Sequence, residues 1–210
     1  MFDDPLRRLE ARLLTPVARA IGPRVPPLAV TAVGLAVGLG AAWCAWRGLY
    51  WAGLAAWLLN RTLDGLDGTL ARTHGGQSDL GGYLDLLADF AVYAAVPIGF
   101  ALAEPADATR AHVALALLAT FYVNGAGWLY LSAVLERRGR GAAARGEPTS
   151  ITMPAGLVAG AETIVLYAVA FAWPAGATAT FAVMAGLVAL TIAQRIGWAV
   201  RSLGPAGTGE

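Results

Sequence analysis

The chain has 210 residues, of which 57% are hydrophobic and only 14% are charged. A soluble domain of this size carries roughly 25% charged residues, so the composition excludes an ordinary soluble protein and indicates an integral membrane protein. The formal net charge of +1 gives no reason to expect a nucleic-acid partner, and the single cysteine, Cys44, gives no sign of a disulfide.

Residues 1–25 are predicted to form an N-terminal interfacial helix and a linker. Within them, Phe2–Gly22 has the pattern of an amphipathic helix on the cytoplasmic membrane surface. Apolar residues recur on one helix face, and the arginines between them can contact lipid headgroups. That face consists of Leu6, Leu9, Leu13 and Val17. The alternative is a solvated helix that packs on the protein's own loops. We expect no signal peptide, because Asp3 and Asp4 open the chain and the first apolar run has full spanning length.

Residues 26–202 predict an all-α transmembrane domain of six spans. The final long run, Thr163–Gln194, exceeds one span and is broken at Trp173–Gly176, so it counts as two helices. The other four spans are Leu28–Trp46, Gly48–Asn60 continued through Asp64 and Asp67, Leu80–Ala103, and Val113–Leu135. Residues 203–210 are rich in glycine and proline and predict a disordered tail.

The basic residues fix the predicted orientation. All fifteen are arginine, and when the spans alternate, thirteen fall on one side and only Arg47 and Arg110 on the other. The positive-inside rule therefore places both termini in the cytoplasm. It also places there the turn after the second span and the loop Glu136–Pro148.

The segment Asn60–Asp89 concentrates carboxylates between apolar runs. Asp64 and Asp67 are three residues apart, and Asp85 and Asp89 are four apart, so each pair shares a helix face. The short turn between the pairs predicts antiparallel neighbouring helices and a common site. Carboxylates that close repel one another and are costly to desolvate, so we predict a bound cation. Hard oxygen ligands suit Mg²⁺ or Mn²⁺, and four carboxylates could hold two such ions for phosphoryl chemistry.

Smaller features carry structural predictions. Ser78 or Asp79 is expected to cap the third span. His74 lies in the turn and is expected to be exposed, with metal binding as the less favoured alternative. Asn124 is expected either to make an internal hydrogen bond or to line a cavity. The glycines of the first span predict close approach between helices, and they are Gly34, Gly38 and Gly40.

The carboxylate segment resembles the signature of the CDP-alcohol phosphotransferase family. All eight defining positions are present over 26 residues: Asp64, Asp67, Gly68, Ala71, Arg72, Gly81, Asp85 and Asp89. The resemblance implies transfer of a phosphatidyl-type group from a CDP-linked lipid, such as CDP-diacylglycerol, to an alcohol, with release of CMP. It also implies six spans, a cytoplasmic N-terminal helix and a homodimer. The chain also resembles a bacterial branch of the family of about this length in which Glu162-Thr163 recurs, and this resemblance implies location in the bacterial inner membrane.

Carried over position by position, the resemblance implies a role for each motif residue. Asp64, Asp67 and Asp85 would be the main metal ligands, and Asp89 would share the site and act as general base. The cytidine-diphosphate pocket would be lined by Asp64, Gly68, Ala71, Arg72 and Gly81, with Thr31 a weaker candidate. One departure is visible, because Leu28 stands where many relatives have an asparagine.

The sequence does not identify the acceptor. Glycerol 3-phosphate, inositol phosphate, serine and a lipid alcohol are all used within the family, and available arginines favour a phosphorylated polyol. The candidate acceptor residues are Arg137, Arg138, Glu162 and Arg195. Glu162 and Arg195 could form a structural ion pair or serve the substrate.

Two other classes of function remain as alternatives. A membrane cation transporter could use the aspartate cluster as its ion site, but a transporter usually needs polar residues along its whole route. Here the motif aspartates all fall at the cytoplasmic end. A catalytically inactive scaffold is disfavoured by the intact motif.

Overall fold

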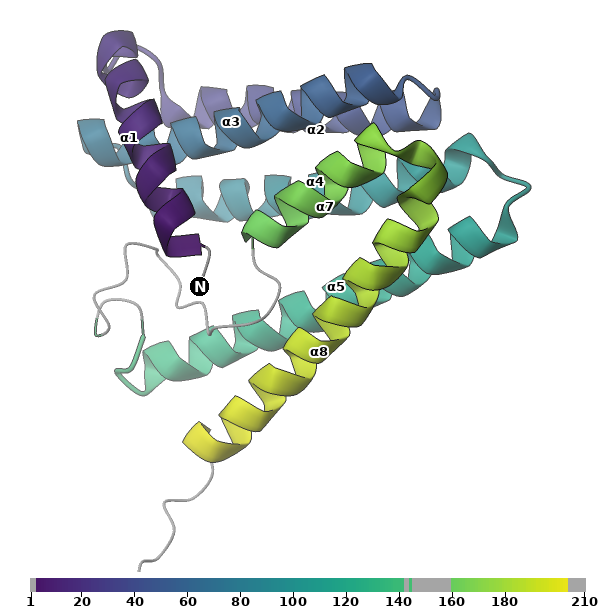
Figure 1. Cartoon of the computed structure of the whole chain (residues 1–210). Coiled ribbons are helices and arrows are strands. Elements are labelled where there is room, and N and C mark those ends of the chain that lie inside the picture. The colour runs from purple at the N-terminus through teal and green to yellow at the C-terminus, as the bar shows by residue number, and fades with distance from the viewer. Residues whose placement is uncertain (1–2, 142–143, 145–159, 204–210) are drawn as a thin grey trace, which may run out of the picture.

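The computed structural model describes residues 3–141, Ala144 and 160–203, with side chains from Arg12 onward. Every element in this part of the chain is helical, and Figure 1 shows their arrangement. The elements are α1 (Asp3–Ile21), α2 (Pro27–Trp46), α3 (Tyr50–His74), α4 (Asp79–Ala103), α5 (Ala108–Arg137), α7 (Gly160–Ala172), the 3-10 turn η1 (Pro174–Gly176) and α8 (Ala177–Leu203).

Among the described residues, four segments are long and apolar enough to cross a membrane: α2, α4, α5 and the η1–α8 segment. The other two predicted spans, in α3 and α7, are not among these four segments because of their charge or their length. The C-terminal half of α3 carries several charged residues, and the described part of α7 has only 13 residues. The all-helical membrane fold is therefore confirmed, whereas the count of six spans stays a prediction. Residues 204–210 of the predicted tail lie outside the described part.

The helices form two packed groups that meet through α4, α7 and α8. The helix α2 packs along both α3 and α4, while α5 pairs with α8. Figure 1 shows α2 and α3 running side by side at the top, with α8 crossing α5 below them. The contacts that α4 makes with α5, and those that α7 makes with α3 and α8, join the groups.

The close packing of α2 on α4 depends on two glycines. A Cβ atom added at Gly38 would lie 2.5 Å from Val92 Cγ2, and one at Gly99 would collide with the carbonyl oxygen of Ala42. The predicted role of the first-span glycines in close helix approach is thus confirmed at Gly38. This approach makes α2 the common support of α3 and α4.

An aromatic cluster fills the interior between α3, α4, α7 and α8. Its rings are stacked, tilted or T-shaped relative to one another, at centroid distances from 5.1 to 6.4 Å. Two hydrogen bonds hold the cluster in register: Trp57 Nε1 donates to the carbonyl of Ile164 at 3.1 Å, and Tyr167 Oη donates to the carbonyl of Tyr93 at 2.7 Å. Because Trp57 and Tyr93 also border the carboxylate segment, this core fixes the base of the candidate site.

The connection between α3 and α4 is a short turn. The helix α3 ends at His74 and is capped by Gly75, which has a left-handed φ of 68° that favours glycine. Ser78 caps α4, because its side chain accepts a hydrogen bond from Gly81 N at 3.1 Å. This confirms one of the two predicted caps. His74 lies by α1, with Nε2 3.1 Å from the carbonyl oxygen of Ala18.

Candidate active site

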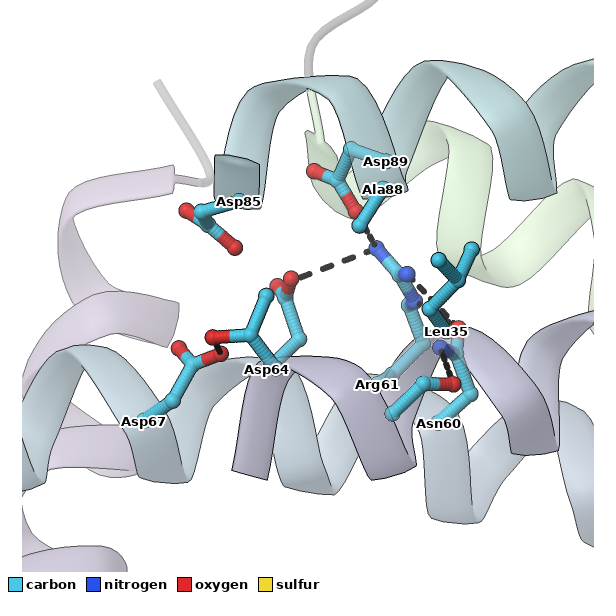
Figure 2. A pocket seen from close by; sticks show the side chains of 10 residues that line it. Leu35, Asn60, Arg61, Asp64, Asp67, Asp85, Ala88 and Asp89 are labelled. Atoms are coloured by element: carbon cyan, nitrogen blue, oxygen red, sulfur yellow. Dashed lines mark hydrogen bonds and ion pairs between the residues drawn. The ribbon is translucent and has the colours of Figure 1, made fainter. Parts of the chain in front are cut away.

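The four motif aspartates line one small cavity between α2, α3 and α4 (Figure 2). The cavity volume is about 10 Å³, which is room for about one water molecule. The cavity is lined by Thr31, Gly34, Leu35, Asn60, Arg61, Asp64, Asp67, Asp85, Ala88 and Asp89. The convergence predicted from the spacing is therefore present in the fold.

The route to this convergence differs from the prediction in one respect. We expected α3 and α4 to be direct neighbours, but each packs mainly on α2. The two aspartate pairs consequently face each other across a gap that α2 closes from the side (Figure 2). The space between the pairs is the small cavity, which has room for about one water-sized group.

Thr31 on α2 holds one of the carboxylates directly. Its Oγ1 donates to Asp67 Oδ2 at 2.6 Å, a distance typical of a charge-assisted hydrogen bond. Asp67 is only 4% exposed. Leu28, which replaces the family asparagine, is 39% exposed and is not among the residues found to line the cavity. The structure thus connects Thr31 to a motif aspartate.

Arg61 also lines the cavity, although the sequence predicted for it only a part in orienting the protein in the membrane. Its Nη1 donates to Asp89 Oδ1 at 2.9 Å and lies 3.8 Å from Asp64 Oδ2. Only 7% of its side chain is exposed. The sequence held a signal for it, because an arginine three residues before Asp64 falls on the same helix face.

The guanidinium of Arg61 is itself held on several sides. Nε and Nη2 donate to Asn60 Oδ1 at 2.8 and 2.6 Å, and Asn60 Nδ2 donates to the carbonyl of Gly34 at 2.8 Å. Nη1 also donates to Tyr93 Oη at 3.0 Å. The Cζ atom lies 4.8 and 5.0 Å from the ring centroids of Trp57 and Tyr93. Such contacts combine cation–π attraction with geometric restraint.

The residues present fit a divalent cation. Carboxylate oxygens are the ligands that Mg²⁺ and Mn²⁺ prefer. Asp85 Oδ1 is buried and has no hydrogen-bond partner in the described part of the chain. A buried acceptor without a partner is costly unless something else satisfies it. Among the described residues, no three His, Cys, Asp or Glu side chains are already placed to hold a metal ion together. Ion binding would therefore require the two aspartate pairs to move closer to each other.

The remaining motif residues lie on the same helices, outside the set found to line the cavity. Arg72 is exposed on α3, and its Nη2 donates to Thr69 Oγ1 at 3.1 Å. A Cβ at Gly68 would lie 3.1 Å from Arg72 Nη1, so the glycine leaves room for this side chain. Ala71 is half-buried, and Gly81 sits in the capped first turn of α4. Their predicted contact with the nucleotide stays a prediction.

The four candidate acceptor residues are not part of the carboxylate cavity as described. Arg137 and Arg138 are exposed at the C-terminal end of α5. On α8, Arg195 Nη1 donates to Asn124 Oδ1 at 2.6 Å, which confirms an internal hydrogen bond for Asn124. Glu162 lies in the first turn of α7. Residues 142, 143 and 145–148 of the Glu136–Pro148 loop lie outside the described residues. The acceptor role of the four candidates stays a prediction.

Comparison with known sequences identifies similar proteins over most of the chain. Residues 24–202 match the family model described as CDP-alcohol phosphatidyltransferase. Inner membrane protein YnjF of Escherichia coli (strain K12) is 38% identical over 156 residues, which cover 73% of this chain and 72% of that protein.

Solved structures of one Mycobacterium tuberculosis protein share the fold. They are of the phosphatidylinositol phosphate synthase PgsA1. The structure with CDP-DAG bound has a TM-score of 0.70 at 22% identity and covers 95% of this chain and 99% of its own. The structure in complex with manganese and citrate has a TM-score of 0.70 at 23% identity, covering 94% and 92%. At these identities the likeness shows the fold alone.

Proposed function

The chain belongs to the CDP-alcohol phosphatidyltransferase family, and on this premise we propose that Asp64, Asp67, Asp85 and Asp89 form its active site. As a member of this family it is an enzyme that transfers a phosphatidyl-type group from a CDP-linked lipid to an alcohol. The observation that carries the site assignment is the convergence of the four motif aspartates on one cavity. The buried, unpartnered oxygen of Asp85 adds to it.

Asp64, Asp67 and Asp85 would hold divalent cations, with Asp89 shared at the site. We propose two ions, Mg²⁺ or Mn²⁺, and the manganese complex of PgsA1 supports this class of cation. When bound, such ions neutralise charge on the pyrophosphate of the donor and make CMP a better leaving group. Thr31 keeps the Asp67 carboxylate oriented toward the cavity through its hydrogen bond.

Asp89 is proposed to act as general base. Its carboxylate accepts the proton of the acceptor hydroxyl, whose oxygen then attacks the lipid-bearing phosphorus of the donor. A new phosphorus–oxygen bond forms to the acceptor, the bond to the CMP phosphate oxygen breaks, and CMP leaves with that electron pair. The Arg72 side chain and the backbone around Gly68, Ala71 and Gly81 are proposed to bind the cytidine diphosphate, with weaker support for Thr31.

A phosphorylated polyol, such as glycerol 3-phosphate or inositol phosphate, is the proposed acceptor. Arginine binds phosphate through paired donors, and Arg195 on α8 retains a buried Nε without a hydrogen-bond partner among the described residues. Arg137, Arg138 and Glu162 are the further candidates. The name of PgsA1, a phosphatidylinositol phosphate synthase, is in keeping with an acceptor of this kind.

We propose that the enzyme lies in a bacterial inner membrane as a six-span homodimer, with both termini and the active site facing the cytoplasm. The relative YnjF is an inner membrane protein. For α1, Leu14, Ala18 and Ile21 pack beside α2 and α3, whereas Leu13 and Val17 are 63% and 44% exposed. Exposed apolar residues on this helix suit contact with the lipid interface.

The test is CMP release by purified protein from CDP-diacylglycerol with Mg²⁺ or Mn²⁺ and a panel of alcohols. We expect release that requires a divalent ion and one acceptor, and that is lost in Asp89→Asn. Folded protein that binds CDP but releases no CMP with any alcohol would contradict the proposed donor or acceptor. Failure to bind any cytidine nucleotide would contradict the proposed function and favour ion transport.

A further inference from the structure

Arg61 places a fixed positive charge between one carboxylate of each aspartate pair. The side chain is 7% exposed, donates to Asp89 Oδ1 at 2.9 Å and lies 3.8 Å from Asp64 Oδ2. Figure 2 shows the guanidinium at one end of the cavity, with Asp67 and Asp85 at the other. The charge is therefore unevenly distributed across the site.

The guanidinium is held independently of the aspartates. Asn60 accepts two of its hydrogen bonds and is tethered to α2 through the carbonyl of Gly34. Tyr93 accepts another, and the rings of Trp57 and Tyr93 border it. An arginine fixed by this many contacts does not follow the motion of a carboxylate but restricts it. The restriction applies to Asp89, whose Oδ1 is the atom bound.

We propose that Arg61 is a positioning residue that holds Asp89 Oδ1 and thereby presents the other carboxylate oxygen to the acceptor hydroxyl. In Figure 2 that second oxygen points away from Arg61. The same positive charge, 2.9 Å from Asp89 Oδ1 and 3.8 Å from Asp64 Oδ2, partly offsets the attraction of the four carboxylates for divalent cations. This inference rests on the proposed function, because it assigns a partner to the proposed base.

The discriminating variant is Arg61→Gln, measured in two independent ways. A misplaced general base lowers kcat by about 100-fold, and we expect the KM for CDP-diacylglycerol to stay within about threefold because the nucleotide residues are untouched. Binding of Mn²⁺ alone, followed by electron paramagnetic resonance without substrates, is expected to tighten roughly tenfold as the competing charge is lost. An unchanged kcat, or Mn²⁺ binding that weakens together with activity, would overturn the proposal.

Arg110 supplies a matched control. Its side chain is also 7% exposed and pairs with Glu104 at 2.9 Å, but it lies in the first turn of α5, outside the set of residues lining the cavity. Arg110→Gln is expected to leave kcat and Mn²⁺ binding unchanged. A loss of kcat in Arg110→Gln as large as that in Arg61→Gln would mean that any buried arginine has this effect, and would count against the proposal.

Two further variants keep the test decisive if Arg61→Gln folds poorly. Arg61→Lys retains the charge but not the planar guanidinium, so we expect its kcat to be roughly tenfold higher than that of Arg61→Gln. A kcat no higher than that of Arg61→Gln would contradict the proposal. Tyr93→Phe removes one hydrogen bond to Arg61 and is expected to lower kcat about 3- to 10-fold, whereas an unchanged kcat would contradict it. If wild-type protein releases no CMP, the proposed function fails, and the Mn²⁺ measurement still decides the role of the Arg61 charge.

Discussion

The hydrogen bond from Thr31 to Asp67 allows a sharp test of how the site binds its cation. Thr31→Val replaces the hydroxyl by a methyl group of similar size and removes the 2.6 Å bond. Hydrogen bonds to charged groups contribute about 1.5–3 kcal/mol, and each 1.4 kcal/mol corresponds to about tenfold in an equilibrium constant. Loss of this bond should therefore weaken cation binding by about 10- to 100-fold, the range found for partners that orient metal ligands.

The assay is the dependence of CMP release on Mg²⁺ or Mn²⁺ concentration at saturating CDP-diacylglycerol. We expect the half-maximal metal concentration to rise by that factor in Thr31→Val, while activity at saturating metal is largely retained. Thr31→Ser keeps the hydroxyl and is the matched control, with an expected shift of less than about threefold. A Thr31→Val enzyme with the wild-type metal dependence would refute the view that Thr31 orients a metal ligand.

Three further predictions concern the scaffold and are measured by thermal unfolding in detergent. Gly99→Ala puts a Cβ against the carbonyl of Ala42, so we expect about 1–3 kcal/mol of destabilisation; an unchanged unfolding temperature would contradict the tight α2–α4 packing. Gly40→Ala, where nothing described lies within 4 Å of the added atom, is the matched control and should be close to neutral or slightly stabilising. Gly75→Ala places an alanine at a φ of 68° at the end of α3, which should lower the free energy of unfolding by about 1 kcal/mol. A variant as stable as the wild type would argue against that turn geometry.

Local patterns in the sequence predicted much of the helical fold and the convergence of the four motif aspartates. The spacings of the aspartate pairs placed each pair on one helix face, and the cavity confirms that they converge. The break at Trp173–Gly176 coincides with η1, and Ser78 caps α4 as one of the two predicted residues. Each of these depends on residues near one another in the chain, where turn and helix geometry are largely determined locally.

The missed features depend on contacts between residues far apart in the sequence. Arg61 meets Tyr93, 32 residues further along the chain. Its place three residues before Asp64 indicates a shared helix face, but that spacing alone does not predict burial between α3 and α4. Likewise, the packing of α3 and α4 on α2, rather than on each other, follows from close contacts such as Gly38 with Val92. Helical periodicity does not determine which of several apolar neighbours a helix chooses.

The central claim is that the four motif aspartates bind the divalent cations used in phosphatidyl transfer. The most direct test is a crystal structure of the protein with Mn²⁺ and a CDP-linked lipid, with the ions located by anomalous scattering. We expect anomalous peaks in the gap between α3 and α4, within coordination distance of Asp64, Asp67 and Asp85. A bound nucleotide with no peak in this gap, or with Mn²⁺ held only elsewhere, would contradict the account.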